Sequence, residues 1–99
     1  MNMHAIMAQA QKMQRDITKK KEEIDNTIFE GKSEWISLTF NGKRELQSFK
    51  ITKSGVIDEE DKEILEDMII IAIKDAFNKI DKETDNKLGS YSKSLNGLI

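Results

Sequence analysis

Three basic side chains share one face of a predicted N-terminal helix, and the chemistry open to them is phosphate binding. Lys12, Arg15 and Lys19 follow one another at spacings of three and four residues, and Lys20 lies beside them. On an α-helix such spacings bring side chains to the same side. Lys and Arg in this arrangement can neutralise successive phosphates of a nucleic acid. The alternative is a solvated helix face on which acidic neighbours pair with the cations.

A second basic pair, Lys43 and Arg44, lies at the tip of a predicted β-hairpin. The dipeptide Asn41-Gly42 directly follows a run of alternating apolar residues and is typical of a type I′ turn with positive φ angles. Side chains displayed at this tip could add phosphate contacts. Turns favour exposed polar residues in any case, so the hairpin is a weaker candidate than the helix face.

Catalytic, metal and redox chemistry find no support in the sequence. The chain has no Cys, and its single histidine, His4, has no second ligand at metal-binding spacing. The acidic run at 58–63 lacks the spacing and central glycine of a calcium loop and is typical of a helix start. No nucleophile motif or glycine-rich phosphate loop occurs. We therefore predict no enzyme, no cofactor, no metal site and no small-molecule substrate.

Six consecutive apolar residues, 68–73, lie in the predicted C-terminal helix. Because a helix turns about 100° per residue, such a run covers nearly the whole circumference and must be buried on more than one side. A chain of 99 residues offers only one side, which predicts a homodimer. The predicted dimer interface contains Met68, Ile69, Ile70, Ile71, Ile73 and Phe77.

The same run excludes a membrane-spanning role. It is far shorter than the ~20 apolar residues that cross a bilayer. The N-terminal segment reads as polar helix with no continuous apolar signal region. We therefore predict a cytoplasmic protein that makes no contact with membranes.

The predicted fold class is α+β, with a long helix, a three-stranded antiparallel sheet and a second long helix. Apolar residues at helical spacing predict the helices, and runs of β-branched and aromatic residues predict the strands. The alternation breaks between Leu46 and Phe49, which predicts a bulge or a change of facing. The elements are placed at about residues 3–25, 27–31, 35–40, 44–51 and 59–89.

Gly89 is predicted to end the second helix, which gives a single domain at 1–89 and a flexible C-terminal tail at 90–99. At 1.5 Å per residue a second helix of about 28 residues is ~42 Å long, whereas a compact domain of this size has a radius of gyration of ~13 Å. The helix ends are therefore expected to project or to lie along a partner. The two halves of the chain also differ in the sign of their net charge. Residues 1–53 contain 10 Lys and Arg against 7 Asp and Glu, whereas residues 54–99 contain 6 Lys and Arg against 11 Asp and Glu. A basic surface on the N-terminal half can attract polyanions while the whole chain stays acidic.

Four segments of the chain stand out by their order and spacing: Ala8–Gln14, Phe40–Lys43, Phe49–Ile51 and Asp61–Ile69. Together they resemble the YbaB/EbfC family of small bacterial nucleoid-associated proteins, and the similarity covers about residues 5–88. The resemblance implies a tweezer-like homodimer that binds double-stranded DNA, associates with the nucleoid and influences its organisation and gene expression. The family has no sharp motif of DNA-contacting residues, so the resemblance implies the activity and not the contacts.

Three departures from the family pattern leave an alternative open. The glycine-rich segment before the hairpin is replaced by residues 31–35, the proline after the return strand is absent, and the C-terminal end is short and lacks a proline-rich, basic ending. The last departure would weaken DNA binding if the family's tail contributes contacts. The alternative is a small dimeric scaffold that binds another protein, with DNA binding weakened or lost. The two hypotheses differ in whether Lys12, Arg15 and Lys19 are free or paired with acids.

Overall fold

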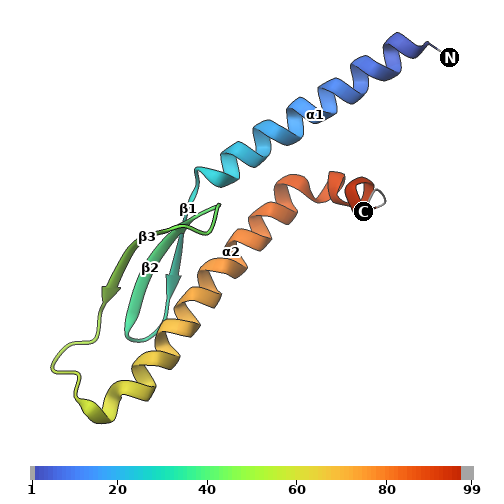
Figure 1. Ribbon diagram of the computed structural model, residues 1–99. Coiled ribbons are helices and arrows are strands. Elements are labelled where there is room, and N and C mark those ends of the chain that lie inside the picture. The colour runs from blue at the N-terminus through green and yellow to red at the C-terminus, as the bar shows by residue number, and fades with distance from the viewer. Residues whose placement is uncertain (1, 97–99) are drawn as a thin grey trace.

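The computed structural model describes the backbone of residues 2–96 and the side chains of residues 2–91. It confirms the α+β class: one helix, a three-stranded antiparallel sheet and a second helix follow one another along the chain (Figure 1). A short 3-10 turn, η1, precedes the second helix. The elements are α1 (Met3–Asp25), β1 (Ile28–Lys32), β2 (Ile36–Asn41), β3 (Leu46–Ile51), η1 (Glu59–Asp61) and α2 (Lys62–Asn96).

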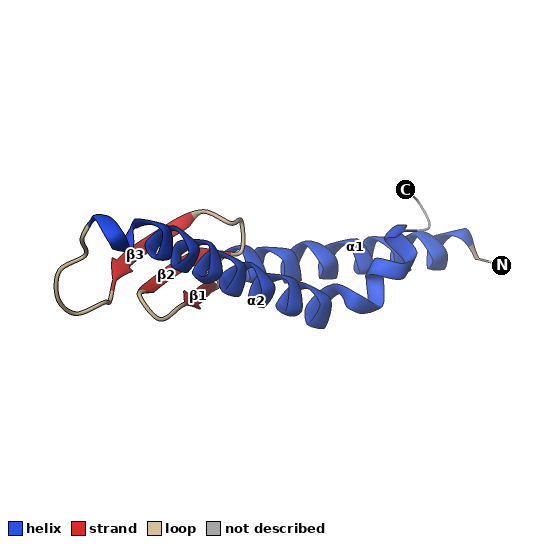
Figure 2. Cartoon of the chain, turned by 90° about the horizontal axis from the view of Figure 1, so that it is seen from below, coloured by secondary structure: helices blue, strands red, loops and turns tan. Residues whose placement is uncertain are grey.

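Helix α1 has the predicted bounds, and most of it lies beyond the sheet. Its first turn is capped by Asn2, whose side-chain oxygen accepts a hydrogen bond from the backbone N–H of His4 at 3.0 Å. Ile24, in the last turn, is its buried residue. The chain is accordingly elongated, with a radius of gyration of 19.6 Å and extents of 71 × 22 × 16 Å, and α1 extends in the same general direction as the C-terminal half of α2 (Figures 1 and 2). The prediction that the long helices project is confirmed.

The core lies between α2 and one face of the sheet. The strands are ordered β1-β2-β3, and α2 packs mainly over β1 and β2. Alternate residues of β2 are buried beneath it, while those between them face the other side. The register of β2 and β3 shifts between Thr39 and Phe40, which confirms the predicted irregularity in the return strand. The buried core consists of Ile24, Phe29, Ile36, Leu38, Phe40, Ala72, Ala76 and Ile80.

The turn between β2 and β3 differs from the predicted type I′ turn. The residue with positive φ is Arg44, at 64°, and Gly42 does not have positive φ. The backbone N–H of Arg44 donates to the carbonyl of Asn41 at 3.0 Å, and the Asn41 side-chain oxygen accepts from the N–H groups of Lys43 and Glu45 at 3.0 Å each. This is a three-residue loop closed by a left-handed residue, a common hairpin alternative. The type I′ prediction is wrong because Asn41 fixes a longer loop through its side chain.

Gly42 is required by packing instead of by its φ angle. A Cβ atom placed there would lie 2.0 Å from the carbonyl oxygen of Ile24, at the end of α1. We expect Gly42→Ala to lower the free energy of unfolding by about 1–3 kcal/mol, because the hairpin must move away from α1. Urea unfolding followed by circular dichroism measures the change. Gly89→Ala is the control, since a Cβ there meets nothing within 4 Å and alanine favours the helix by about 1 kcal/mol. Equal stability of the Gly42 variant and wild type would contradict the close approach.

The 3-10 turn η1 begins at Glu59, where the sequence predicts the helix start, whereas α2 begins at Lys62 and ends later than predicted. Asp58 caps η1 by accepting from the N–H of Glu60, and α2 then runs through Gly89 to Asn96. The prediction that Gly89 ends the helix is wrong. A glycine inside a helix costs only about 1 kcal/mol, and flanking residues hold the helix in place: Leu88 packs against the core and Tyr91 bonds to α1. The division into a domain at 1–89 and a flexible tail at 90–99 stays a prediction, and residues 97–99 of that tail lie outside the described residues.

Candidate nucleic-acid interface

Lys12, Arg15 and Lys19, which we call the cationic stripe, are exposed on the part of α1 that lies beyond the sheet. Within the described part of the chain, none of the three has a carboxylate within 4.0 Å. All three line an open hollow between α1 and the C-terminal part of α2, together with Gln9, Met13, Asp16 and Tyr91. The structure therefore brings the three predicted cations together, and no carboxylate among the described residues pairs directly with any of them.

Asp16 is the acidic residue on this surface, and it is held toward α2. Its Oδ2 accepts a hydrogen bond of 2.5 Å from the Tyr91 hydroxyl, and Lys20 Nζ lies 3.5 Å from the same oxygen. The Tyr91 hydrogen bond, more than the charges of Lys20 and Lys19, holds the pKa of the Asp16 carboxyl below its ordinary value against a smaller opposing effect of desolvation. The same hydrogen bond raises the pKa of Tyr91. At neutral pH the pair therefore consists of a charged carboxylate and a neutral phenol.

Lys20 lies beside the Asp16–Tyr91 pair. Unlike the cationic stripe, its ammonium has partners within the part of the chain that is described. Besides its contact with Asp16, its ammonium lies 5.2 Å from the centroid of the Tyr91 ring, a cation–π geometry. A second ion pair, Lys87 Nζ to Glu23 Oε2 at 3.0 Å, joins α2 to α1 one turn away. The sequence predicted Lys20 as a candidate phosphate ligand, and the structure gives its charge a contact within the chain.

The two predicted cations at the hairpin tip, Lys43 and Arg44, differ in their contacts. Arg44 Nη2 lies 2.5 Å from Asp81 Oδ1, and the guanidinium carbon lies 4.6 Å from the centroid of the Phe77 ring. Lys43 is exposed, and no ion pair is formed by its side chain among the residues that the structure describes. The tip packs on the last turn of α1, where Gly42 approaches Ile24. Arg44 thus fixes the hairpin to α2, and Lys43 remains as the available charge.

The predicted dimer residues fall into two sets within the single chain. Met68, Ile69, Ile73 and Phe77 are partly buried against the chain's own core. Ile70 and Ile71 are each 49% exposed, on the sides of α2 that its own sheet leaves uncovered. The apolar run therefore has only part of its surface covered by the protomer.

Strand β3 carries an exposed apolar surface that the sequence did not predict as interface. Leu46, Phe49 and Ile51 pair with the buried residues of β2 and so lie on the helix side of the sheet, yet all three are exposed. A helix about 10 Å wide covers two strands spaced 4.8 Å apart, and α2 packs mainly over the other two. A three-stranded sheet is wider than the single helix that covers it. That comparison of widths, open to sequence reasoning, would have indicated that β3 stays exposed.

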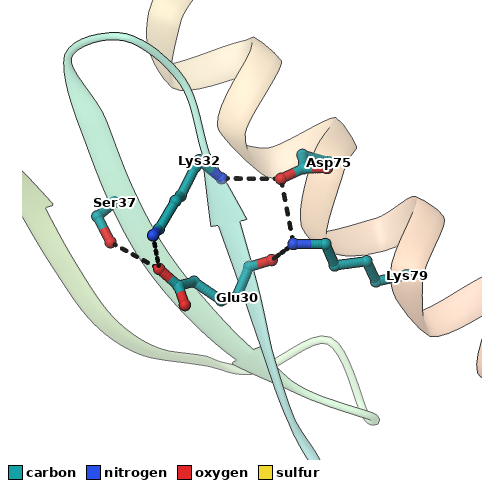
Figure 3. Close-up of polar contacts among 5 residues, drawn as sticks. All are labelled: Glu30, Lys32, Ser37, Asp75 and Lys79. Carbon is teal, nitrogen blue, oxygen red and sulfur yellow. Dashed lines mark hydrogen bonds and ion pairs between the residues drawn. The ribbon is translucent and has the colours of Figure 1, made fainter.

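The opposite edge of the sheet is closed by α2. The backbone N–H of Lys32 donates to Asp75 Oδ2 at 3.0 Å, and Lys79 Nζ donates to the backbone carbonyl of Glu30 at 2.7 Å (Figure 3). Lys79 also pairs with Asp75 at 3.5 Å, and Glu30 holds Lys32 at 3.0 Å. These side chains occupy hydrogen-bonding groups on the edge of β1 that would otherwise be open to another strand.

The described side chains, those of residues 2–91, include no group of three or more His, Cys, Asp or Glu that could hold a metal ion. Over the same stretch, no helix is long and apolar enough to cross a membrane.

The fold and the cationic stripe define a small α+β protein with a basic surface on a long N-terminal helix. The sequence profile of the YbaB/EbfC DNA-binding family matches residues 1–95, and this chain belongs to that family. The resemblance inferred from its sequence segments is thereby confirmed.

The similarity to known proteins extends over nearly the whole chain. A nucleoid-associated protein of Lactococcus lactis subsp. lactis is 46% identical over 97 residues, which are 96% of this chain and 97% of that protein. A nucleoid-associated protein of Enterococcus faecalis is 39% identical over 99 residues, 98% of this chain and 94% of that one. The crystal structure of an uncharacterized protein from Helicobacter pylori shares the fold, with a TM-score of 0.70 at 24% identity over 100% of this chain and 99% of that chain.

Proposed function

We propose that this chain is a nucleoid-associated protein that binds double-stranded DNA as a homodimer, through phosphate contacts made by the cationic stripe. Membership of a DNA-binding family and the nucleoid-associated relatives support the general activity. The observation that carries the choice of surface is that Lys12, Arg15 and Lys19 are exposed together and lack carboxylate partners among the described residues. Cations already paired within the chain would gain less from a phosphate.

Binding by this surface is driven by the release of counterions from DNA. Each neutralised phosphate contributes about 0.9 to the slope of log affinity against log salt concentration. Two copies of a three-cation stripe neutralise about six phosphates, for a slope near −5. Phosphate contacts position a protein without reading base sequence, so specificity is modest.

A second copy of the chain is the partner that fits the exposed apolar surfaces. Ile70 and Ile71 on α2, and Leu46, Phe49 and Ile51 on β3, are apolar side chains left in solvent by the isolated protomer. Exposed patches of this kind mark protein interfaces in soluble proteins. The edge of β1 is occupied by Asp75 and Lys79, whereas β3 has α2 over little of its surface. The open side of the protomer is therefore the side of β3 and the outer surface of α2.

The test of the proposed function is a titration of a fluorescently labelled duplex of random sequence, followed by anisotropy at several salt concentrations. We expect binding whose logarithmic salt slope lies near −5 for a dimer, with similar affinity for unrelated sequences. A slope near zero would show that phosphate contacts do not dominate. Absence of binding at low salt, with the protein folded, would overturn the proposal.

A small dimeric scaffold that binds another protein is the second candidate. The net charge of −2 per chain, which opposes association with DNA at long range, favours it. The uncompensated cationic stripe is the observation against it. The same titration separates the two functions, because a scaffold without DNA affinity would leave the anisotropy of the duplex unchanged.

A further inference from the structure

Asp16 lies where it could compete with DNA for the cationic stripe. It follows Lys12 by four residues and precedes Lys19 by three, the two spacings at which side chains on a helix form ion pairs. Its carboxylate nevertheless contacts neither of them and instead lies within reach of Tyr91 and Lys20. A contact with α2 therefore holds the Asp16 carboxylate on the α2 side of α1.

Tyr91 is the side chain positioned to do this. Its hydroxyl donates to Asp16 Oδ2 across the gap between the two helices, and its ring lies under the ammonium of Lys20. Hydrogen bonds to an ionised group are about twice as strong as those between neutral groups. The contact also explains why α2 continues past Gly89, because the helix must reach Tyr91 to make it.

We propose that Tyr91 is a positioning residue for the DNA-binding surface, which keeps the Asp16 carboxylate away from Lys12 and Lys19 so that both ammonium groups remain available to phosphate. Asp16 is then an internal competitor for phosphate, and its orientation sets how many cations of α1 can act. This inference rests on the proposed DNA-binding function for its consequence. The competition within the chain stands on the geometry of α1 and α2 alone.

A double-mutant cycle tests the consequence. Tyr91→Phe removes the hydroxyl, and we expect weaker duplex binding with a salt slope shallower by about 2 for a dimer, because one phosphate contact is lost on each α1. Asp16→Asn removes the competing charge, and we expect tighter binding. The double variant is expected to match Asp16→Asn. If Tyr91→Phe weakens binding equally in the Asp16→Asn background, Tyr91 acts through its own contact or through the fold, and the positioning role is wrong.

A second measurement needs no DNA. Acylation of lysine amines by a reactive ester, read by mass spectrometry, reports whether Lys12 and Lys19 are paired with a carboxylate, since pairing holds an amine in its unreactive charged form. We expect Lys12 and Lys19 to react more slowly in Tyr91→Phe than in wild type, and Lys82, an exposed lysine of α2, to be unchanged. Equal rates at Lys12 and Lys19 would overturn the inference. If the wild-type protein binds no DNA while Tyr91→Phe still shows the slower acylation, the proposed function alone is overturned.

Discussion

Reversal of the cationic stripe, with Lys12→Glu, Arg15→Glu and Lys19→Glu, is expected to lower the affinity for duplex DNA by about 10³-fold at low salt and to remove its salt dependence. The proposed dimer would lose about six phosphate contacts and gain repulsive charges in their place. The three side chains are exposed and have no carboxylate partner among the described residues, so the fold loses no ion pair. Anisotropy of a labelled duplex measures the loss, and size-exclusion chromatography with light scattering confirms the dimer.

A matched pair of variants separates local contact from net charge. Lys12→Glu with Lys19→Glu changes the net charge of the chain by the same amount as Lys50→Glu with Lys82→Glu. Lys50 on β3 and Lys82 on α2 are also exposed, and the described residues provide neither with an ion pair. We expect the first pair to weaken binding far more than the second. Equal losses would mean that the overall field of the protein, and not the cationic stripe, attracts DNA. Dissociation of the dimer by the stripe variant would instead place these residues in the interface.

The features that sequence reasoning found are those set by local pattern. Apolar residues at helical spacing predicted the first helix at about residues 3–25, and its observed bounds are Met3–Asp25. The broken alternation between Leu46 and Phe49 gave the register shift in the hairpin. Each depends on side chains within a few residues of one another, so the sequence contains the whole cause.

The features that it missed depend on contacts between distant segments. Gly42 was read as a residue for positive φ, whereas its role is to let the hairpin approach Ile24. Gly89 was read as a helix stop, although Leu88 packs against the core and Tyr91 bonds to Asp16, 75 residues away. Pairing of Arg44 with Asp81 likewise joins residues 37 positions apart. The candidate site could therefore be located on α1 from spacing, while which of its cations are free required the packing of α2.

Ile70→Asp is expected to convert the dimer to a folded monomer. In the isolated protomer Ile70 is half exposed, so an aspartate there can stay in water and the core is retained. In a dimer that covers this side of α2, the carboxylate would be buried without a partner, at a cost of several kcal/mol. Light scattering gives the mass, and circular dichroism shows whether the protomer keeps its fold.

Loss of the dimer is also expected to reduce the salt dependence of DNA binding. A monomer presents one cationic stripe instead of two, so the salt slope of Ile70→Asp is expected to fall to about half that of wild type. Val56→Asp is the control, because Val56 is 83% exposed in the loop before η1 and carries the same change of charge. We expect it to leave both mass and slope unchanged. A dimeric Ile70→Asp protein would mean that α2 faces solvent on this side, and the exposed residues of β3 would then be the interface to test, with Phe49→Asp.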